Sequence, residues 1–173
     1  MSGEASRRVG LISDTHGLLR PEAIAFLRGS DLIVHGGDIG REDILGELAT
    51  LAPVTAVRGN NDTGPWARAV RETEALRMGE VAIYVVHDLG ELDLDPAAAG
   101  FQVVVSGHSH RPSVVERDGV LYVNPGSAGP RRFKLPIAVG ELLIVEKSVR
   151  ARVVELDVGG QVPRPRSAGG STR

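Results

Sequence analysis

Five short apolar runs, each followed by a residue that can bind a metal ion, constrain this chain more than any other feature. The runs cover residues 9–13, 31–37, 54–59, 81–86 and 103–107, and the residues that follow them are Asp14, Asp38, Asn60, His87 and His108. Short Val- and Ile-rich runs that end at Gly, Asn or Asp predict β-strands. The intervals between the five polar residues are 24, 22, 27 and 21 residues, about one strand and its connection each. Because ligands of open α/β sheets bind beyond the carboxyl ends of the strands, this recurrence predicts one shared site.

The connections between the first three runs predict helices, over about 20–28 and 41–51. Pro21 lies near the first turn of the earlier segment and Gly29 lies just past its end, which is the usual asymmetry of helix termini. Strands that alternate with helices predict parallel pairing with right-handed crossovers. After residue 110 the pattern changes, because Asp118-Gly119 predicts a tight hairpin and residues 138–156 predict two more strands. We therefore expect an antiparallel second half that forms a second sheet packed on the first.

The chain of 173 residues fits one domain, which we expect to span residues 1–157. Residues 158–173 are rich in Gly, Pro, Ser and Arg without an apolar period, and they predict a flexible tail. The N-terminal residues lack the apolar core of a signal peptide, and no apolar run reaches the roughly 18–20 residues of a membrane span. A cytoplasmic protein outside the membrane is the resulting expectation.

Charge and cysteine content exclude several classes of function. The net charge of −2 gives no sign of general nucleic-acid binding. The chain contains no cysteine, so disulfides, thiolate metal sites and a cysteine nucleophile are impossible. Any metal ion must therefore be held by nitrogen and oxygen ligands.

Two of the polar turns carry a second candidate ligand two residues on, His16 after Asp14 and His110 after His108. In an extended chain, residues i and i+2 point to the same side, so we expect each pair to face one site. Seven candidate ligands exceed the needs of one ion, which predicts two divalent ions about 3.5–4 Å apart that share a carboxylate and a water. Such a water supplies hydroxide near neutral pH, and phosphorus is its natural electrophile.

Each residue taken alone has a simpler interpretation. Asp14 or Asp38 could cap the helix that follows, and Asn60-Asn61 could form an ordinary turn. Recurrence at the strand ends is what favours the metal site. His35 lies inside its apolar run, and there we favour a buried histidine over a direct ligand. All three asparagines of the chain, including Asn124, fall in glycine-containing turns, for which a site is the expected reason.

These residues resemble the signature of the calcineurin-like metallophosphoesterases. The matching motifs are DTH at 14–16, GGD at 36–38, GNND at 59–62, His87 after its strand and GHSH at 107–110, and the resemblance extends over residues 10–127. The short length, GNND and NPGS at 124–127 resemble the small prokaryotic phosphodiesterase subgroup, which the eukaryotic retromer scaffold subunit also resembles. The resemblance implies a four-layer α/β/β/α sandwich with two mixed sheets. It also implies a binuclear metal-dependent hydrolase of small phosphodiesters that attacks with a metal-bridging hydroxide.

The resemblance also implies a role for each residue. Asp14, His16, Asp38 and His110 would hold the first ion, and Asp38, Asn60, His87 and His108 would hold the second, with Asp38 as the bridge. Asp62 would orient a neighbouring ligand. Manganese is the expected metal, and Fe, Zn and Ni suit the same ligands.

Two departures from the family pattern bear on catalysis. Larger members carry histidine where Asn61 stands, and that histidine is thought to protonate the leaving group, which an amide cannot do. Asn61 would instead hydrogen-bond a phosphate oxygen, which favours diesters or good leaving groups. Relatives often read H-G-H where this chain reads His87-Asp88-Leu89, so a further histidine is missing.

Positive charge for the substrate could come from Arg58 or Arg111, whereas Arg131 and Arg132 fit solvated surface better. Two other functions stay open, a phosphomonoesterase of nucleotides or sugar phosphates and a non-catalytic scaffold like the retromer subunit. A scaffold would be expected to have lost ligands, and here all seven are retained. Relatives commonly self-associate, so a homo-oligomer is also an open expectation.

Overall fold

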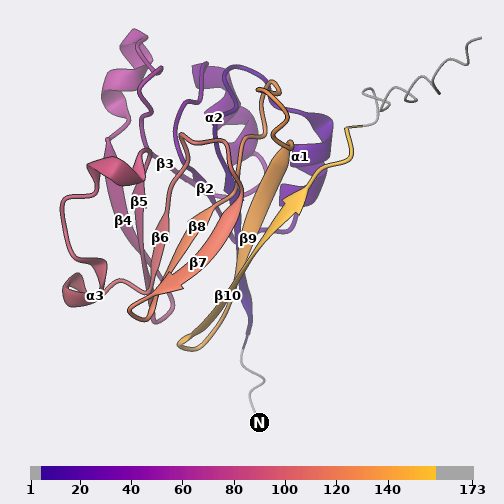
Figure 1. The fold of residues 1–173 in the computed structure, drawn as a ribbon. Coiled ribbons are helices and arrows are strands. Elements are labelled where there is room, and N and C mark those ends of the chain that lie inside the picture. Colours follow the sequence, from indigo (N-terminus) through magenta and orange to yellow (C-terminus); the bar gives the residue numbers. More distant parts are fainter. Residues whose placement is uncertain (1–4, 159–173) are drawn as a thin grey trace, which may run out of the picture.

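The structure is a computed structural model that describes residues 5–158 (Figure 1). Two five-stranded sheets run in the orders β10-β9-β1-β2-β3 and β4-β5-β6-β8-β7. The strands are β1 Arg7–Ile12, β2 Leu32–His35, β3 Val54–Ala56, β4 Thr73–Met78, β5 Val81–Val86, β6 Val103–Val105, β7 Ser113–Arg117, β8 Val120–Asn124, β9 Ala138–Val145 and β10 Ser148–Glu155. The helices are α1 Pro21–Leu27, α2 Glu42–Ala49 and α3 Pro96–Ala99, with 3-10 turns η1 Pro65–Ala69 and η2 Leu89–Glu91.

The first sheet contains the parallel unit that the sequence predicts. β1 pairs with β2 and β2 with β3, both in parallel, and α1 and α2 provide the crossovers. Pro21 begins α1, where its missing N–H costs nothing. The helices bury an apolar stripe against the outer face of this sheet, formed by Ala23, Leu27, Ile44 and Leu48. Local chemistry is therefore enough to specify this half of the fold.

A second sheet packs on the first as expected, and β7 and β8 form the expected hairpin in it, but the expectation of an antiparallel second half confined to that sheet is wrong in two respects. β5, β6 and β8 are parallel neighbours within the second sheet. β9 and β10 form the expected hairpin, but β9 pairs antiparallel with β1 and so extends the first sheet. The reason is the apolar face of β9, since Leu142 and Ile144 pack with Val9 and Leu11 in the core between the sheets.

The two sheets pack face to face through aliphatic side chains, most of them β-branched. Val34 and Leu11 of the first sheet share one buried cluster with Ile83, Val85 and Val105 of the second. Such side chains suit a pleated, half-buried surface. The parallel strands of both sheets point their carboxyl ends toward the same end of the molecule, where the turn after β5 contacts the turn after β2 and the turn after β6 contacts the turn after β1.

The outer face of the second sheet carries a thinner layer. Tyr84, Val86 and Val104 face outward, where Phe101 and Leu92 of the η2–α3 region cover them. α3 has only four residues and is capped by Asp95, whose side chain accepts hydrogen bonds from two backbone N–H groups. The four-layer α/β/β/α sandwich is confirmed, with one helical layer much smaller than the other.

The predicted tail falls almost wholly outside the part of the chain that the structure describes. Residue 158 is the exception, because Val158 is described and its side chain is buried. Among the described residues, no helix has the length and apolar character needed to cross a membrane.

Candidate metal centre

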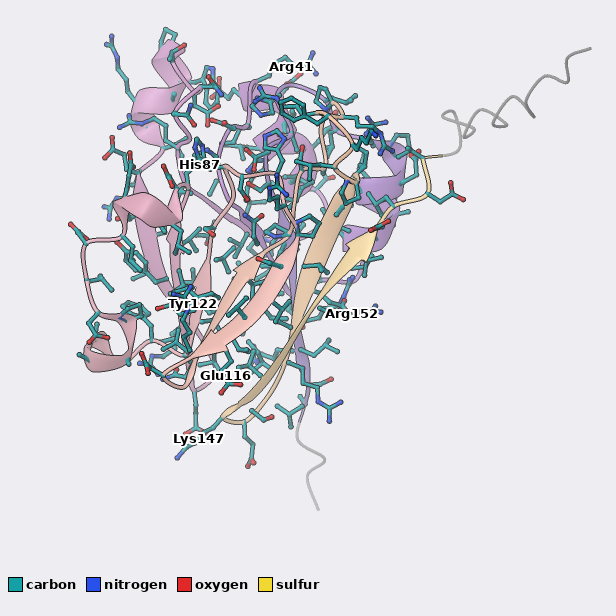
Figure 2. The ribbon with its side chains drawn as sticks, viewed as in Figure 1. Arg41, His87, Glu116, Tyr122, Lys147 and Arg152 are labelled. Atoms are coloured by element: carbon teal, nitrogen blue, oxygen red, sulfur yellow. The ribbon has the colours of Figure 1, made fainter. Side chains whose placement is uncertain are left out.

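The polar turns after the strands of both sheets come together at one end of the molecule. In Figure 2, His87 lies at this end, opposite the β9–β10 hairpin that carries Lys147. Two hydrogen bonds join the sheets here: His87 Nδ1 lies 2.7 Å from the carbonyl oxygen of Gly36, and the His108 N–H donates to Asp14 Oδ2 at 3.1 Å. The predicted site therefore lies between two sheet edges and not along one.

The backbone at these turns differs from the extended conformation that we expected. Five of the seven candidate ligands have positive φ, namely Asp14 (54°), His16 (46°), Asp38 (56°), His108 (71°) and His110 (62°). The extended interpretation of the i, i+2 pairs is wrong, because each turn is left-handed. A left-handed non-glycine residue costs roughly 1–2 kcal/mol, and such strain is typical of functional sites.

One group of candidate ligand atoms gathers around Asp14 Oδ1. This oxygen is buried and makes no hydrogen bond among the described residues, yet Nε2 of His110 lies 3.3 Å from it and Nε2 of His16 lies 3.8 Å away. The two Nε2 atoms are themselves 3.3 Å apart. Carboxylate and imidazole groups that converge in a buried space are the arrangement that a cation stabilises.

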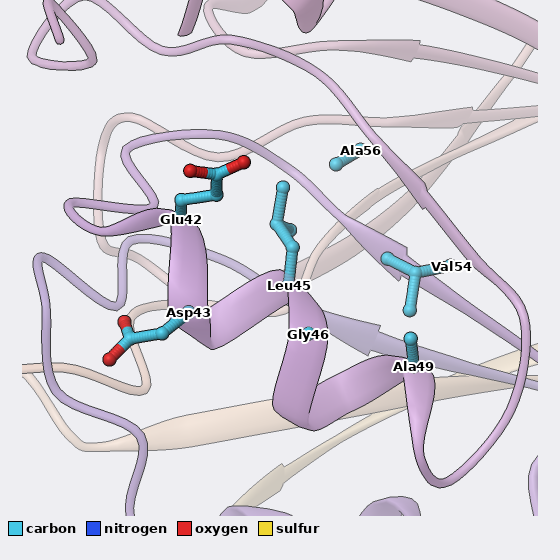
Figure 3. Close-up of a pocket in the computed structure, with 7 residues that line it drawn as sticks. All are labelled: Glu42, Asp43, Leu45, Gly46, Ala49, Val54 and Ala56. Carbon is cyan, nitrogen blue, oxygen red and sulfur yellow. The ribbon is translucent and has the colours of Figure 1, made fainter. Parts of the chain in front are cut away.

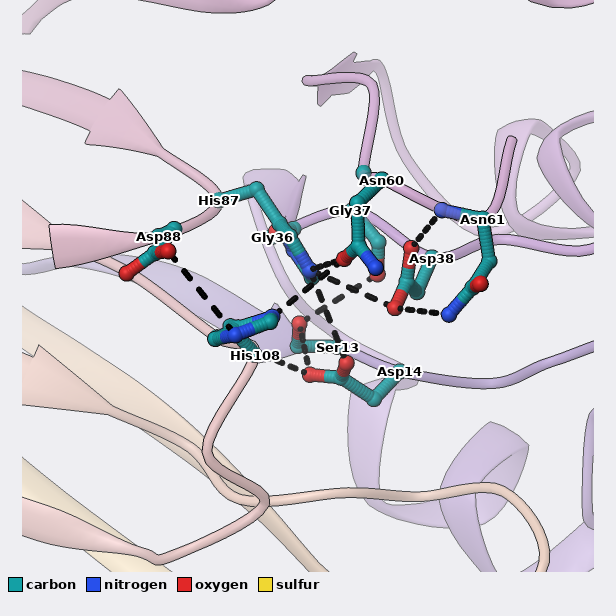
Figure 4. A network of polar contacts seen from close by, with 12 residues as sticks. Ser13, Asp14, Gly36, Gly37, Asp38, Asn60, Asn61, His87, Asp88 and His108 are labelled. Carbon is teal, nitrogen blue, oxygen red and sulfur yellow. Dashed lines mark hydrogen bonds and ion pairs between the residues drawn. The ribbon is translucent and has the colours of Figure 1, made fainter. Parts of the chain in front are cut away.

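A second group gathers around Asn60 and Asp38 (Figure 4). Oδ1 of Asn60 lies 3.1 Å from Nε2 of His87 and 3.2 Å from Nδ1 of His108. Oδ2 of Asp38 lies 3.3 Å from Nε2 of His87 and 3.8 Å from Nε2 of His16, a member of the first group. The structure therefore brings all seven residues together, with Asp38 between the two groups.

The hydrogen bonds of His87 fix which nitrogen faces the centre. A backbone carbonyl can only accept, so Nδ1 of His87 donates its proton to Gly36. In the neutral ring, Nε2 then presents a lone pair toward Asp38 and Asn60. A backbone partner of this kind is the usual support of a metal-binding histidine.

His87 and Asp38 shift each other's pKa in opposite directions. Burial alone lowers the pKa of His87, but the hydrogen bonds to Asp38 and Gly36 and the nearby carboxylates raise it to about 9. Burial raises the pKa of Asp38, but hydrogen bonds from His87 and Asn61 outweigh it and hold that pKa well below its usual range. Without a cation, the pair is thus ionised over the whole neutral range.

His35 is buried and satisfied by protein groups. Its Nδ1 accepts from the Gly37 N–H at 3.1 Å, so Nε2 carries the proton and donates to Thr15 Oγ1 at 3.0 Å. Both ring nitrogens are therefore occupied. Burial lowers the pKa of His35 to about 4. The geometry agrees with the interpretation of His35 as a buried histidine.

Asp62 and Asn61 support the turns that carry the candidate ligands. The carboxylate of Asp62 accepts from the backbone N–H groups of Ile39, Gly40 and Gly59 at 2.9–3.1 Å. The backbone and side-chain N–H groups of Asn61 donate to the two carboxylate oxygens of Asp38 at 2.8 and 3.0 Å. Asn61 thus orients Asp38, a contact that the sequence reasoning did not anticipate.

Sequence reasoning missed two serines that hold Asp14. Ser13 Oγ donates to Asp14 Oδ2 at 2.7 Å, and Ser127 Oγ donates to the Asp14 carbonyl at 3.0 Å. Asn124, by contrast, was expected near a site, and its side-chain N–H groups donate to Gly107 O and Ser109 Oγ in the GHSH turn. The NPGS motif contains Ser127 and is the signal that could have identified it, whereas Ser13 has no signal in the sequence beyond its place before Asp14.

Of the two arginines expected near the substrate, one lines a cavity at the centre. Arg58 borders a cavity of about 140 Å³ together with Asn60, His87 and His108, and its guanidinium donates to Glu72 at 2.8 Å. Arg111 is exposed beyond the GHSH turn. A larger pocket of about 610 Å³ lies elsewhere, between α2 and β3 (Figure 3). Its lining is aliphatic with two carboxylates, from Glu42 and Asp43, so it is a poor site for a phosphate ester.

The donor set fits divalent cations. One ligand atom from each of Asp14, His16 and His110 lies within 4.8 Å of the other two, and the same holds for Asp14, Asp38 and His87. Imidazole and carboxylate ligands suit Mn, Fe, Zn and Ni. Asp14 Oδ1, which is buried without a hydrogen bond, is the atom that most needs such a partner.

Known proteins are similar to this chain in sequence and in fold. A sequence model of the calcineurin-like phosphoesterase superfamily domain matches residues 8–147. The chain is 40% identical over 140 residues to a protein named probable metallophosphoesterase from Methanothermobacter thermautotrophicus, covering 74% of this chain and 81% of that one. It is 26% identical over 166 residues to a phosphodiesterase from Methanocaldococcus jannaschii, covering 86% and 99%. The solved structure of vacuolar protein sorting 29 from Cryptosporidium parvum has a similar fold, with a TM-score of 0.76, 21% identity and coverage of 89% and 93%.

Proposed function

The chain belongs to the calcineurin-like phosphoesterase superfamily, and on that basis we propose that it hydrolyses phosphodiesters with two bound divalent ions, manganese being the best candidate. One group of ligands would be Asp14, His16, Asp38 and His110, and the other Asp38, Asn60, His87 and His108. The observation that carries the proposal is the convergence of these seven side chains in two adjacent groups, one around Asp14 Oδ1, which is buried without a hydrogen bond, and one around Asn60, with Asp38 between them.

The ions, when bound, would acidify a water molecule near neutral pH and neutralise charge on the phosphate oxygens. The chain supplies the surroundings in which this happens. Ser13 and the His108 N–H fix Asp14, Asn61 fixes Asp38, and the Gly36 carbonyl fixes the tautomer of His87. Groups held in this way need not reorganise during the reaction.

The preference for diesters follows from the absence of an acidic proton on the side chain of Asn61. An amide has no proton to give to a departing alkoxide at physiological pH, so a substrate with a good leaving group is favoured. A relative that carries the name phosphodiesterase agrees with this preference. A phosphomonoesterase would share the machinery and differ in the shape of the pocket.

The test is turnover of bis-p-nitrophenyl phosphate by metal-loaded protein, with p-nitrophenyl phosphate as the monoester. We expect Mn²⁺-stimulated hydrolysis that favours the diester, and loss of at least about 1,000-fold in Asp38→Ala, because both ions lose a ligand. Asp43→Ala is the matched control, since Asp43 is an exposed aspartate on α2. Fully loaded protein that turns over no diester would refute the proposal.

The similarity in fold to vacuolar protein sorting 29 keeps a scaffold as the second candidate. Elemental analysis together with the hydrolysis assay separates the two functions. A scaffold would bind near-stoichiometric metal that Asp38→Ala abolishes, yet it would show no hydrolysis before the substitution.

A further inference from the structure

A basic loop with an aromatic tip projects beside the candidate metal centre. We call residues 129–136, with the sequence GPRRFKLP, the Phe133 loop. Residues 130–134 are all exposed between the buried Gly129 and the buried Ile137. Phe133 is 90% exposed, far more than any other large apolar side chain among the described residues. Three cations and no acid surround it in the loop, in a chain whose net charge is −2.

The base of the Phe133 loop is fixed to the turn that carries Asp14. Ser127 Oγ donates to the Asp14 carbonyl at 3.0 Å, and the Ala128 N–H donates to Ser13 O at 3.0 Å. A Cβ atom on Gly129 would lie only 2.4–2.5 Å from the carbonyl oxygens of Thr15 and Asp14. The neck of the loop is therefore packed closely against the turn that carries Asp14 and is hydrogen-bonded to it.

The two ends of the loop are also closed onto each other. Ser127 forms a parallel bridge with Ile137, and the Ala138 N–H donates to Ser127 O at 2.9 Å. Within the loop, the Leu135 N–H donates to Arg132 O at 3.1 Å. Compact surface loops with close ends are frequently functional.

Phe133 itself occupies a strained position. Its φ is +53°, a left-handed conformation that costs a bulky side chain roughly 1–2 kcal/mol and that glycine adopts freely. An exposed phenylalanine at this position adds no apolar surface to the core and does not favour the conformation of its own backbone. An aromatic face between cations is the arrangement by which proteins bind nucleobases and the phosphates attached to them.

We propose that the Phe133 loop selects nucleotide phosphodiesters, with the nucleobase stacked on Phe133 and the phosphate drawn toward the centre by Arg132 and Lys134. The inference rests on the proposed function and names the class of its substrate. A protein-docking role fits less well, since the neighbours of Phe133 in the loop are cations and not the apolar side chains of a contiguous patch.

Binding to Mn²⁺-loaded protein tests the loop without relying on turnover. The probes are thymidine 5′-monophosphate and methyl phosphate, which differ by the nucleoside, measured by isothermal titration calorimetry. Stacking of about 1–3 kcal/mol per base predicts a preference of roughly five- to 150-fold for the nucleotide. Phe133→Ala should reduce the preference to below about twofold and leave the affinity for methyl phosphate unchanged. Phe133→Tyr should retain it.

Two further variants make the test sharper. Phe133→Gly removes the ring and also the backbone strain, so the preference should vanish while the melting temperature stays equal or rises. Arg132→Gln should weaken both probes by a similar factor, because its charge acts on phosphate. Val115→Ala, which changes an exposed residue on β7, is the control and should alter neither.

Equal binding of the two probes by the unmodified protein, or a preference that survives in Phe133→Ala, would overturn the inference. The proposed function fails separately. If the protein prefers the nucleotide but does not hydrolyse bis-p-nitrophenyl phosphate, the inference about the loop stands and the proposed function fails. If it hydrolyses the diester without preferring the nucleotide, the proposed function stands and the inference about the loop fails.

Discussion

At the residue scale, the candidate ligands differ from ordinary turn residues in where their backbone lies. His16 has a φ of +46° and so combines a side chain that faces Asp14 with a conformation that glycine prefers. A single such residue would be an outlier, but five at one site indicate that stability has been given up for geometry. This cost can be measured when the metal is absent.

We predict that His16→Gly is more stable than His16→Ala by about 1 kcal/mol in metal-free protein, because only the alanine is strained at positive φ. Urea unfolding in the presence of a chelator measures the difference. The same pair of substitutions at Glu116, in the extended strand β7, should give the opposite order. If glycine is not favoured at position 16, the left-handed turn is not a source of strain.

His35 makes stability depend on pH. Its pKa is about 4 in the folded protein because the ring is buried, against roughly 6.5 for an unperturbed histidine. Below pH 6.5 the unfolded chain binds a proton that the folded protein resists, so the contribution of His35 is complete above pH 6.5 and is lost as the pH falls toward 4. The difference amounts to about 3 kcal/mol.

The prediction is that His35→Gln flattens this part of the curve. Glutamine can accept from the Gly37 N–H and donate to Thr15, yet it does not titrate. Urea unfolding at pH 7 and pH 5 with a chelator, for both proteins, isolates the difference. Equal losses of unfolding free energy in the two proteins would show that His35 is not the group responsible.

At the scale of elements, the loop after β2 and the loop after β3 act as one unit because Asp62 joins them. Its carboxylate accepts from the backbone of Ile39, Gly40 and Gly59, and these residues flank Asp38 and Asn60. The close packing is visible at Gly59, where a Cβ atom would lie 2.1 Å from Asp38 Oδ1. The position of the two ligands therefore depends on the pairing of the loops.

Asp62→Ala should destabilise the protein by about 2–4 kcal/mol, since it leaves buried N–H groups without an acceptor. It should also weaken metal binding, because Asp38 and Asn60 lose their relative position. Asp62→Asn keeps one acceptor oxygen and should lose less of both quantities. Thermal unfolding and a metal titration give the two values, and an unchanged metal affinity in Asp62→Ala would contradict the proposed coupling.

At the scale of the whole molecule, the candidate centre joins the two sheets. Asp14, His16, Asp38 and Asn60 follow strands of the first sheet, and His87, His108 and His110 follow strands of the second. The core between the sheets is aliphatic, so the polar end is held mainly by the contacts around His87 and Asp14. Bound cations would add a link there that the metal-free protein lacks.

Metal binding should therefore stabilise the folded protein. Free Mn²⁺ at about 100 times its dissociation constant should add roughly 2.7 kcal/mol per site. The gain should shrink as the pH falls below about 9, because His87 must release its proton to bind. Calorimetric melting with Mn²⁺ or chelator measures the shift, which Asp43→Ala should keep and Asp38→Ala should lose. A melting temperature indifferent to Mn²⁺ would argue against the centre.

The amino-acid sequence by itself determined every strand except β4, the parallel β1–β2–β3 unit and the identity of the residues that meet at the centre. Periodicity and turn chemistry are local, and an Asp, Asn or His after a run such as residues 81–86 can be recognised without knowing its neighbours. Because these signals are local, they do not show which strands pair, and the sheet to which β9 belongs was predicted wrongly. Pairing of β9 with β1 joins residues far apart in the chain, such as Arg7 and Ile144, which are 137 positions apart.

Only the tertiary structure decided the features that depend on contacts between groups far apart in the chain. The left-handed turns at Asp14 and His108 lie against each other and are joined by a hydrogen bond between residues 94 positions apart. The hold of Asn61 on Asp38 and the attachment of the base of the Phe133 loop to the turn that carries Asp14 are likewise set by contacts between distant segments. The sequence specifies which functional groups are available, and packing between distant segments decides where each of these groups lies.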